Sequence, residues 1–271
     1  MNNLVVRSLT GLVFISSIIF PVLFSKEAAV GVFSVYFVLG IIEFYRLFQS
    51  GERFEVNWET STVFACIIYG LSIGAALGWI PAWTLMTIPC LAFILFLLEL
   101  WRKTKRPLNN MAINIFGIVY LVLPFTFITI LANQPHTGFP LVLGMFILIW
   151  INDSFAYLSG RFLGKNKMFE RVSPKKTWEG TIGGFLFTVA GGILIAYFTE
   201  QEFVFWIISA VIISPLSIVG DLLESLMKRD LNIKDSGNIL PGHGGILDRF
   251  DATIFVAPFY FFWIFIYSFV L

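Results

Sequence analysis

Acidic side chains recur at the ends of apolar stretches of this sequence. Asp153 and Asp221 each end a long apolar run, where an unpaired charge costs about 2.5–3.5 kcal/mol on membrane-insertion scales. Asp248 and Asp251 lie three residues apart where the last apolar run begins, so they share one face of a helix. Four carboxylates that meet at one membrane surface would form a hard oxygen site suited to Mg²⁺. They lack the His and Cys ligands expected at a zinc site.

Basic residues and glycines accompany these acids. Asp221 precedes Glu224 and Lys228 by three and seven residues, which predicts one polar stripe along a helix. The run Pro-Gly-His-Gly-Gly at 241–245 predicts a tight turn whose N–H groups can bind phosphate. A metal ion held by carboxylates and surrounded by basic side chains is typical of enzymes that transfer phosphoryl or nucleotidyl groups. The cations in question are Lys175, Lys176, Lys228, Arg229, Lys234 and Arg249.

Several of these residues also have a plainer interpretation. His243, taken alone, is more often structural than catalytic, and Asp153 by itself could hydrogen-bond a neighbouring helix. Glu43 and Arg46 lie three residues apart and are expected to form a structural pair. Lys105 and Arg106 are most simply signals of membrane topology.

The elements that must position these residues are membrane helices. Of the 271 residues, 58% are hydrophobic and 13% are charged, whereas soluble domains carry about a quarter charged residues. Long apolar runs satisfy their backbone groups in a bilayer only as helices. We therefore expect an all-α polytopic membrane protein of about nine transmembrane helices, at 9–24, 28–48, 62–79, 82–100, 111–132, 139–159, 181–198, 203–222 and 252–271.

The basic residues predict how these helices are oriented. With nine helices, only Lys26 of the 18 Lys and Arg residues lies on the side opposite the N-terminus. The positive-inside rule then places the N-terminus and the three polar blocks of the chain, at 153–180, 220–229 and 241–251, in the cytoplasm. Net charge is +1 and there is no basic tail, so no nucleic-acid partner is expected. Cys66 and Cys90 are expected to be packing residues.

Four motifs lie in the C-terminal half of the chain: Ser-Pro-Lys-Lys-Thr-Trp-Glu-Gly from Ser173, Ser-x-x-Lys-Arg from Ser225, Lys-Asp-x-Gly from Lys234, and His-Gly-Gly-x-x-Asp-Arg-x-Asp from His243. In this pattern, the residues from Asp153 to Asp251 resemble the phosphatidate cytidylyltransferase (CDP-diacylglycerol synthase) family. Two positions depart from it: Arg161 stands where lysine is expected, and Ala252 where many members have serine. The first departure keeps the charge, and the second removes a hydroxyl.

The resemblance implies a reaction and a location. Members condense CTP with phosphatidic acid to give CDP-diacylglycerol and pyrophosphate, with Mg²⁺, in phospholipid biosynthesis. The implied mechanism is a metal-assisted in-line attack of the lipid phosphate on the α-phosphorus of CTP. The protein would lie in the cell inner (cytoplasmic) membrane among membrane lipids, with its active site facing the cytoplasm. Residues 1–132 would form helices one to five and 133–271 the catalytic region; the sequence leaves homodimerisation open.

The resemblance and the chemistry above together give three sets of candidate residues. The expected metal ligands are Asp153, Asp221, Asp248 and Asp251. The expected catalytic residues are Asp221, Lys228, Arg229, His243, Asp248, Arg249 and Asp251. The expected nucleotide- and phosphate-binding residues are Ser173, Lys175, Lys176, Thr177, Lys234, Gly244 and Gly245.

Two other functions stay open at this point. A related CTP-using enzyme, such as a polyprenol or phytol kinase or a synthase of ether-lipid CDP derivatives, would share the helices and the phosphate chemistry. A transporter would use its intramembrane acids to carry ions or protons. The placement of the polar blocks on one side and the lack of a detectable inverted repeat disfavour the transporter.

Overall fold

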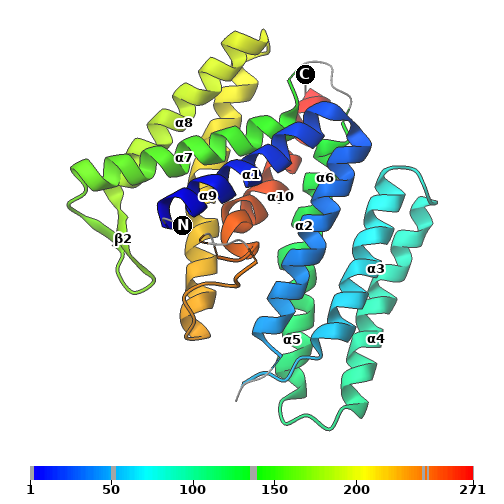
Figure 1. Ribbon diagram of the computed structural model, residues 1–271. Helices are drawn as coiled ribbons and strands as arrows, with labels where there is room; N and C mark the ends of the chain where they lie inside the picture. The colour runs from blue at the N-terminus through cyan, green and yellow to red at the C-terminus, as the bar shows by residue number, and fades with distance from the viewer. Residues whose placement is uncertain (1–2, 50–52, 135–138, 240–241, 243, 271) are drawn as a thin grey trace. The chain divides into compact units, whose positions relative to one another are not determined.

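The described chain is almost entirely helical. The structure is a computed structural model and describes residues 3–49, 53–134, 139–239, 242 and 244–270. Besides helices, these residues form an antiparallel β-hairpin of β1 (Lys167–Phe169) and β2 (Ser173–Thr177). The expectation of an all-α polytopic membrane protein is confirmed (Figure 1).

The apolar helices follow the order expected from the sequence. In the described residues, eight segments are long and apolar enough to cross a membrane, and the apolar helix Ser8–Phe24 is shorter. The number that cross a membrane and the side of the N-terminus stay predictions. The eight segments are Lys26–Leu47, Trp58–Ala76, Ala82–Trp101, Pro107–Ala132, Leu141–Leu163, Trp178–Thr199, Phe203–Asp230 and Leu247–Phe269.

The chain packs as two compact units. The first comprises Met1–Asn133 with Asp235–Arg249, and the second comprises Gln134–Lys234 with Phe250–Leu271. The first boundary lies beside the expected division after residue 132. The segment 235–249, which carries part of the family pattern, packs with the N-terminal helices. That catalysis belongs to 133–271 stays a prediction.

The first unit is a helical bundle that contains a 3₁₀ segment at Ala82–Met86 and a π-helical segment at Ile118–Val122. Ser25 and Asn57 start two of its helices by accepting hydrogen bonds from the N–H groups of Ala28 (3.0 Å) and Thr60 (3.1 Å), as N-cap residues do. Its core contains stacked rings of Phe37 and Tyr69. The elements are α1 (Asn3–Phe24), α2 (Lys26–Leu47), α3 (Trp58–Ala76), η1 (Ala82–Met86), α4 (Thr87–Trp101), α5 (Pro107–Gly117), η2 (Ile118–Val122) and α6 (Leu123–Ala132).

The second unit contains α7 (Leu141–Leu163), α8 (Trp178–Thr199), α9 (Phe203–Asp230) and the part of α10 (Leu247–Val270) from Phe250 onward. The β1–β2 hairpin connects α7 to α8 and lies at one end of that pair (Figure 1). Thr177, the last residue of β2, caps α8 through a bond from the N–H of Gly180.

Glycines bring α7 and α8 into close contact. A Cβ at Gly180 would lie 2.7 Å from the carbonyl oxygen of Ala156 and 3.1 Å from the Cα of Gly160. Membrane helices use small residues in this way because backbones that approach closely gain van der Waals contact where lipid supplies no hydrophobic driving force. The pair therefore forms a firm support for the hairpin, which carries Lys175 and Lys176.

Candidate active site

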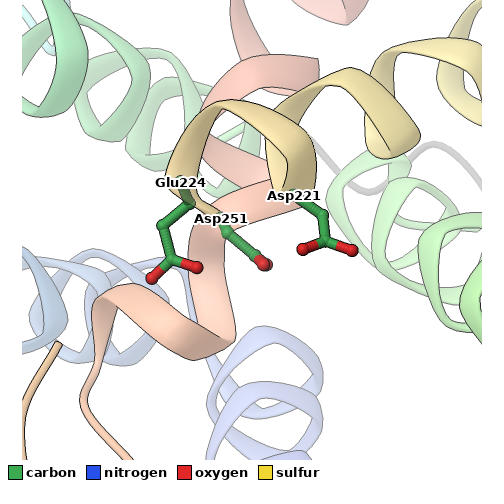
Figure 2. Close-up of side chains that lie close together, drawn as sticks. All are labelled: Asp221, Glu224 and Asp251. Carbon is green, nitrogen blue, oxygen red and sulfur yellow. The ribbon is translucent and has the colours of Figure 1, made fainter. Parts of the chain in front are cut away.

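Three carboxylates converge where α9 passes α10. Asp221 and Glu224 lie one helical turn apart on α9, and Asp251 lies on α10 (Figure 2). One oxygen of each lies within 4.8 Å of the others. We call these three residues the acidic cluster.

The close approach of the two helices depends on Gly220. A Cβ at this position would lie 2.7 Å from the carbonyl oxygen of Asp251 and 2.9 Å from the Cα of Ala252. These are backbone atoms, so a larger residue would push the helices apart. Gly220 thus allows Asp221, the next residue, to approach Asp251.

Lysines lie directly against the acidic cluster. Lys228 Nζ is 2.5 Å from Glu224 Oε2, four residues earlier on α9. Lys176, from β2, places its Nζ 2.6 Å from Asp221 Oδ2 and donates to the carbonyl oxygen of Ile218 at 3.2 Å. The hairpin and α9, which are distant in sequence, therefore bring opposite charges to one place.

The residues of the acidic cluster fit a divalent cation of the magnesium type. All three donors are carboxylate oxygens, the ligands that Mg²⁺ prefers. Glu224 is 1% exposed, and charged groups buried to this degree are normally paired or hold metals. The Lys176 and Lys228 ammoniums are positive charges beside two of the three carboxylates.

The acidic cluster agrees in part with the expected metal set. Asp221 and Asp251 are brought together, and Glu224 joins them, although the sequence had placed it only on the polar stripe of α9. Its spacing of three residues from Asp221 was the signal available. Asp153 is exposed and accepts a bond from the amide of its neighbour Asn152 at 3.3 Å. Its role as a ligand stays a prediction.

Asp248 lies in the first unit, where it holds the segment before α10. Its Oδ2 accepts bonds from the backbone N–H groups of Gly245 (2.8 Å) and Ser236 (3.1 Å). Gly244 has a φ of +82°, a conformation that glycine adopts without strain. The predicted turn therefore has a glycine where its backbone requires one. His243 lies outside the described residues.

The remaining cations and hydroxyl residues divide by exposure. Lys175, Arg229, Lys234 and Arg249 are exposed, and Ser173 is half-buried. Arg229 reaches the carbonyl oxygen of Ile233 at 3.5 Å. Thr177 is 6% exposed and caps α8, so its position supports a structural role in addition to the expected phosphate contact.

One functional candidate was missed in the sequence. Glu43 does not show the expected contact with Arg46 among the described hydrogen bonds and ion pairs; its carboxylate bonds to Ser236, Ile246 and Leu247. Arg46 lies over the ring of Trp58, with its guanidinium carbon 4.3 Å from the centroid. No local pattern indicates partners about 200 residues away.

The fold and the acidic cluster together define a polytopic membrane protein with lysine-flanked carboxylates. Residues 5–269 match the cytidylyltransferase family, and the chain belongs to that family. It is therefore an enzyme of the nucleotidyltransferase class, which confirms the resemblance read from the sequence.

Curated relatives carry a more specific name. A phosphatidate cytidylyltransferase of Staphylococcus saprophyticus is 34% identical over 183 residues, covering 67% of this chain and 69% of the relative. A protein of the same name from Staphylococcus aureus is 35% identical over 182 residues, covering 66% and 69%. One from Staphylococcus epidermidis is 33% identical with the same coverage.

Proposed function

We propose that this enzyme condenses CTP with phosphatidic acid to give CDP-diacylglycerol and pyrophosphate in phospholipid biosynthesis. The name of its relatives supports the substrate pair. The observation that carries the proposal is the acidic cluster of Asp221, Glu224 and Asp251, whose oxygens lie within 4.8 Å, with Lys176 and Lys228 against it. This arrangement suits the transfer of a nucleotidyl group, which depends on positioning and on stabilising charge.

The acidic cluster would hold Mg²⁺, with Asp153 as a further candidate ligand, and the metal-linked role of Asp248 is retained from the family pattern. When bound, the metal supplies positive charge that neutralises the triphosphate and orients it for displacement. The donor set supports Mg²⁺ over zinc because all three groups are carboxylates.

Lys176 and Lys228 would stabilise negative charge on the nucleotide. Their ammoniums lie 2.6 Å and 2.5 Å from carboxylate oxygens, so a phosphate bound at the acidic cluster is within their reach. Ammonium groups bind phosphate as compact point charges. These two lysines would therefore hold the triphosphate and stabilise the departing pyrophosphate.

The reaction needs no general base. A phosphate monoester has a second pKa near 6, so phosphatidic acid is largely an anion near pH 7. A lipid phosphate oxygen forms a bond to the α-phosphorus of CTP while the bond from that phosphorus to the β-phosphate bridging oxygen breaks, and pyrophosphate leaves with the electron pair. The chain's own residues hold the two anions in line.

The other predicted residues complete the phosphate site in this proposal. Exposed Lys175, Arg229 and Lys234 would meet the phosphates from the aqueous side, and the phosphate role of exposed Arg249 is retained from the family pattern. Ser173, Thr177, His243, Gly244 and Gly245 are retained from the family pattern. The backbone N–H of Gly245 already bonds Asp248, so for this glycine we expect a role in loop shape.

The enzyme would lie in the cytoplasmic membrane, with the site facing the cytoplasm. The distribution of Lys and Arg supports this orientation, since only Lys26 falls on the other side under the nine-helix topology. The acyl chains would stay in the bilayer while the headgroup reaches the nucleotide.

The direct test is to incubate the purified protein in detergent with phosphatidic acid, labelled CTP and Mg²⁺. Label that enters a lipid-soluble product, with one pyrophosphate released per product, supports the proposal. Release of CDP without pyrophosphate would indicate a lipid kinase. A folded sample with metal that turns over no CTP would favour the transporter.

A further inference from the structure

Glu43 is a buried carboxylate near the end of α2 that holds a distant segment. Its side chain is enclosed, with the residue 5% exposed. One of its oxygens accepts bonds from the Ser236 hydroxyl and from the N–H of Leu247 (3.1 Å), and the other accepts from the N–H of Ile246 (2.9 Å). All four residues belong to the first unit. Both carboxylate oxygens of Glu43 thus accept hydrogen bonds from residues about 200 positions away in the sequence.

Two glycines give the segment room to close around Glu43. A Cβ at Gly237 would lie 2.6 Å from Glu43 Oε2, and one at Gly245 would come closer still to the same carboxylate. Neither glycine has a positive φ, so space, not backbone conformation, requires glycine here. The carboxylate and the two glycines form one complementary contact.

The contact fixes the start of α10. Leu247 is the first residue of that helix, and the first N–H groups of a helix have no acceptor within it. A negative charge at that position also interacts favourably with the helix dipole. Asp248 also binds these residues, because its carboxylate accepts hydrogen bonds from the N–H groups of Ser236 and Gly245. Ser236 is therefore held by both acids, through its hydroxyl by Glu43 and through its backbone by Asp248.

We infer that Glu43 is a positioning residue: through Ser236, Ile246 and Leu247 it fixes the start of α10, and so the position of Asp248 and Arg249 for the reaction. Glu43 touches none of the reacting groups in this scheme and acts through the segment. The inference deepens the proposed cytidylyl transfer. Those of its tests that measure turnover rest on that proposal. The inference assigns a functional residue to the N-terminal helices.

The first test is Glu43→Gln, which keeps the size of the side chain. Glutamine has a single oxygen, so its NH₂ group must face either the N–H of Ile246 or that of Leu247. A buried donor without an acceptor destabilises the local structure. We expect kcat for CTP turnover to fall roughly tenfold or more, and amide hydrogen exchange at Ile246 and Leu247 to become faster while the remainder of α2 keeps its protection.

Glu99→Gln is the matched control. Glu99 is 4% exposed in the same unit and accepts bonds from Arg102, Thr104 and Asn110, all distant in sequence from segment 236–247. Its replacement should lower thermal stability in detergent without changing exchange at Ile246 and Leu247. Similar loss of kcat and similar exchange in both variants would overturn the positioning role.

A compensating pair makes the test independent of simple misfolding. Gly245→Ala places a methyl group against the Glu43 carboxylate, and Glu43→Asp withdraws that carboxylate by one methylene. The double variant should regain part of the kcat that Gly245→Ala loses, which is a non-additive effect expected only for residues in contact. Purely additive losses would overturn the inference. If the wild-type protein turns over no CTP, the proposed function fails, whereas exchange at Ile246 and Leu247 still decides the role of Glu43.

Discussion

At the scale of single residues, Glu224 shows how burial changes the role of an acid. It is 1% exposed, beside Asp221 and Asp251, and pairs with Lys228. Removing one member of a buried charge pair leaves the other without compensation and costs about 3–5 kcal/mol. Glu224 is therefore both a structural partner of Lys228 and a candidate metal ligand.

Replacing Glu224 tests its role as a metal ligand. Glu224→Gln should lower the apparent Mg²⁺ affinity about tenfold or more, because one charged oxygen donor is lost from the cluster. Initial rates of CTP turnover over a range of Mg²⁺ concentrations measure this. Asp230→Asn, which changes an exposed acid at the end of the same helix, should stay within about twofold of wild type. An unchanged Mg²⁺ dependence in Glu224→Gln would remove Glu224 from the metal site.

A substitution at Asp248 can separate the effect of its negative charge from its effect on the conformation of the loop before α10. Both of these backbone bonds go to one oxygen, Oδ2, so an asparagine with its oxygen at that place keeps them and removes the charge. Asp248→Asn should abolish turnover while the N–H groups of Ser236 and Gly245 stay protected from exchange, because the loss lies in the chemistry. Asp248→Ala should lose both. Near wild-type turnover in Asp248→Asn would exclude a metal-linked role.

At the scale of elements, the acidic cluster exists because α9 and α10 touch. Gly220 lies at the contact, and farther along the two helices the Nε1 of Trp263 donates to the Ser209 hydroxyl at 3.1 Å. The interhelical bond fixes the rotation of the helices, and the glycine fixes their separation. Together they set the distance between Asp221 and Asp251.

A single methyl group at Gly220 tests this dependence. Gly220→Ala would place its Cβ 2.7 Å from a backbone oxygen of α10, so the helices must separate and turnover should fall at least tenfold, as misplaced catalytic groups commonly cause. Gly70→Ala is the control, because a Cβ there meets nothing within 4 Å, and alanine is the better helix former. Turnover and thermal stability measured for both variants check the prediction. Equal activities would show that the contact does not set the site.

At the scale of the whole molecule, the orientation in the membrane is a prediction that labelling can check. The test uses a variant in which Cys66 and Cys90 are replaced, so that an introduced cysteine is the single thiol. With Lys26→Cys, this thiol should react with a membrane-impermeant maleimide added to spheroplasts whose cytoplasmic membrane is intact. A cysteine at Lys105 should react only after the membrane is opened, because the positive-inside rule places that loop in the cytoplasm. The reverse pattern would invert the topology and move the site to the outer face.

Much of the architecture follows from one-dimensional features of the sequence. Apolar runs of spanning length must be helical in a bilayer, and their boundaries are near those expected; the seventh expected run, 181–198, appears as α8 (Trp178–Thr199). Caps such as Thr177 are local in sequence. Charged residues at the edges of these runs, Asp153 and Asp221 where runs end and Asp248 and Asp251 where the last run begins, were predicted as metal ligands because charge at such positions needs a reason.

The sequence by itself thus determined the helical membrane class and the family, and it proposed four candidate acids that include Asp221 and Asp251, because periodicity, length and motif spacing are local properties. Only the tertiary structure decided which side chains meet. It added Glu224 to the acidic cluster, brought Lys176 from the hairpin to Asp221, and joined Glu43 to the segment before α10. Spacing along one helix can suggest such a contact, but contacts between distant segments depend on which helix faces pack together, and that is settled by the fit of the whole set of side chains.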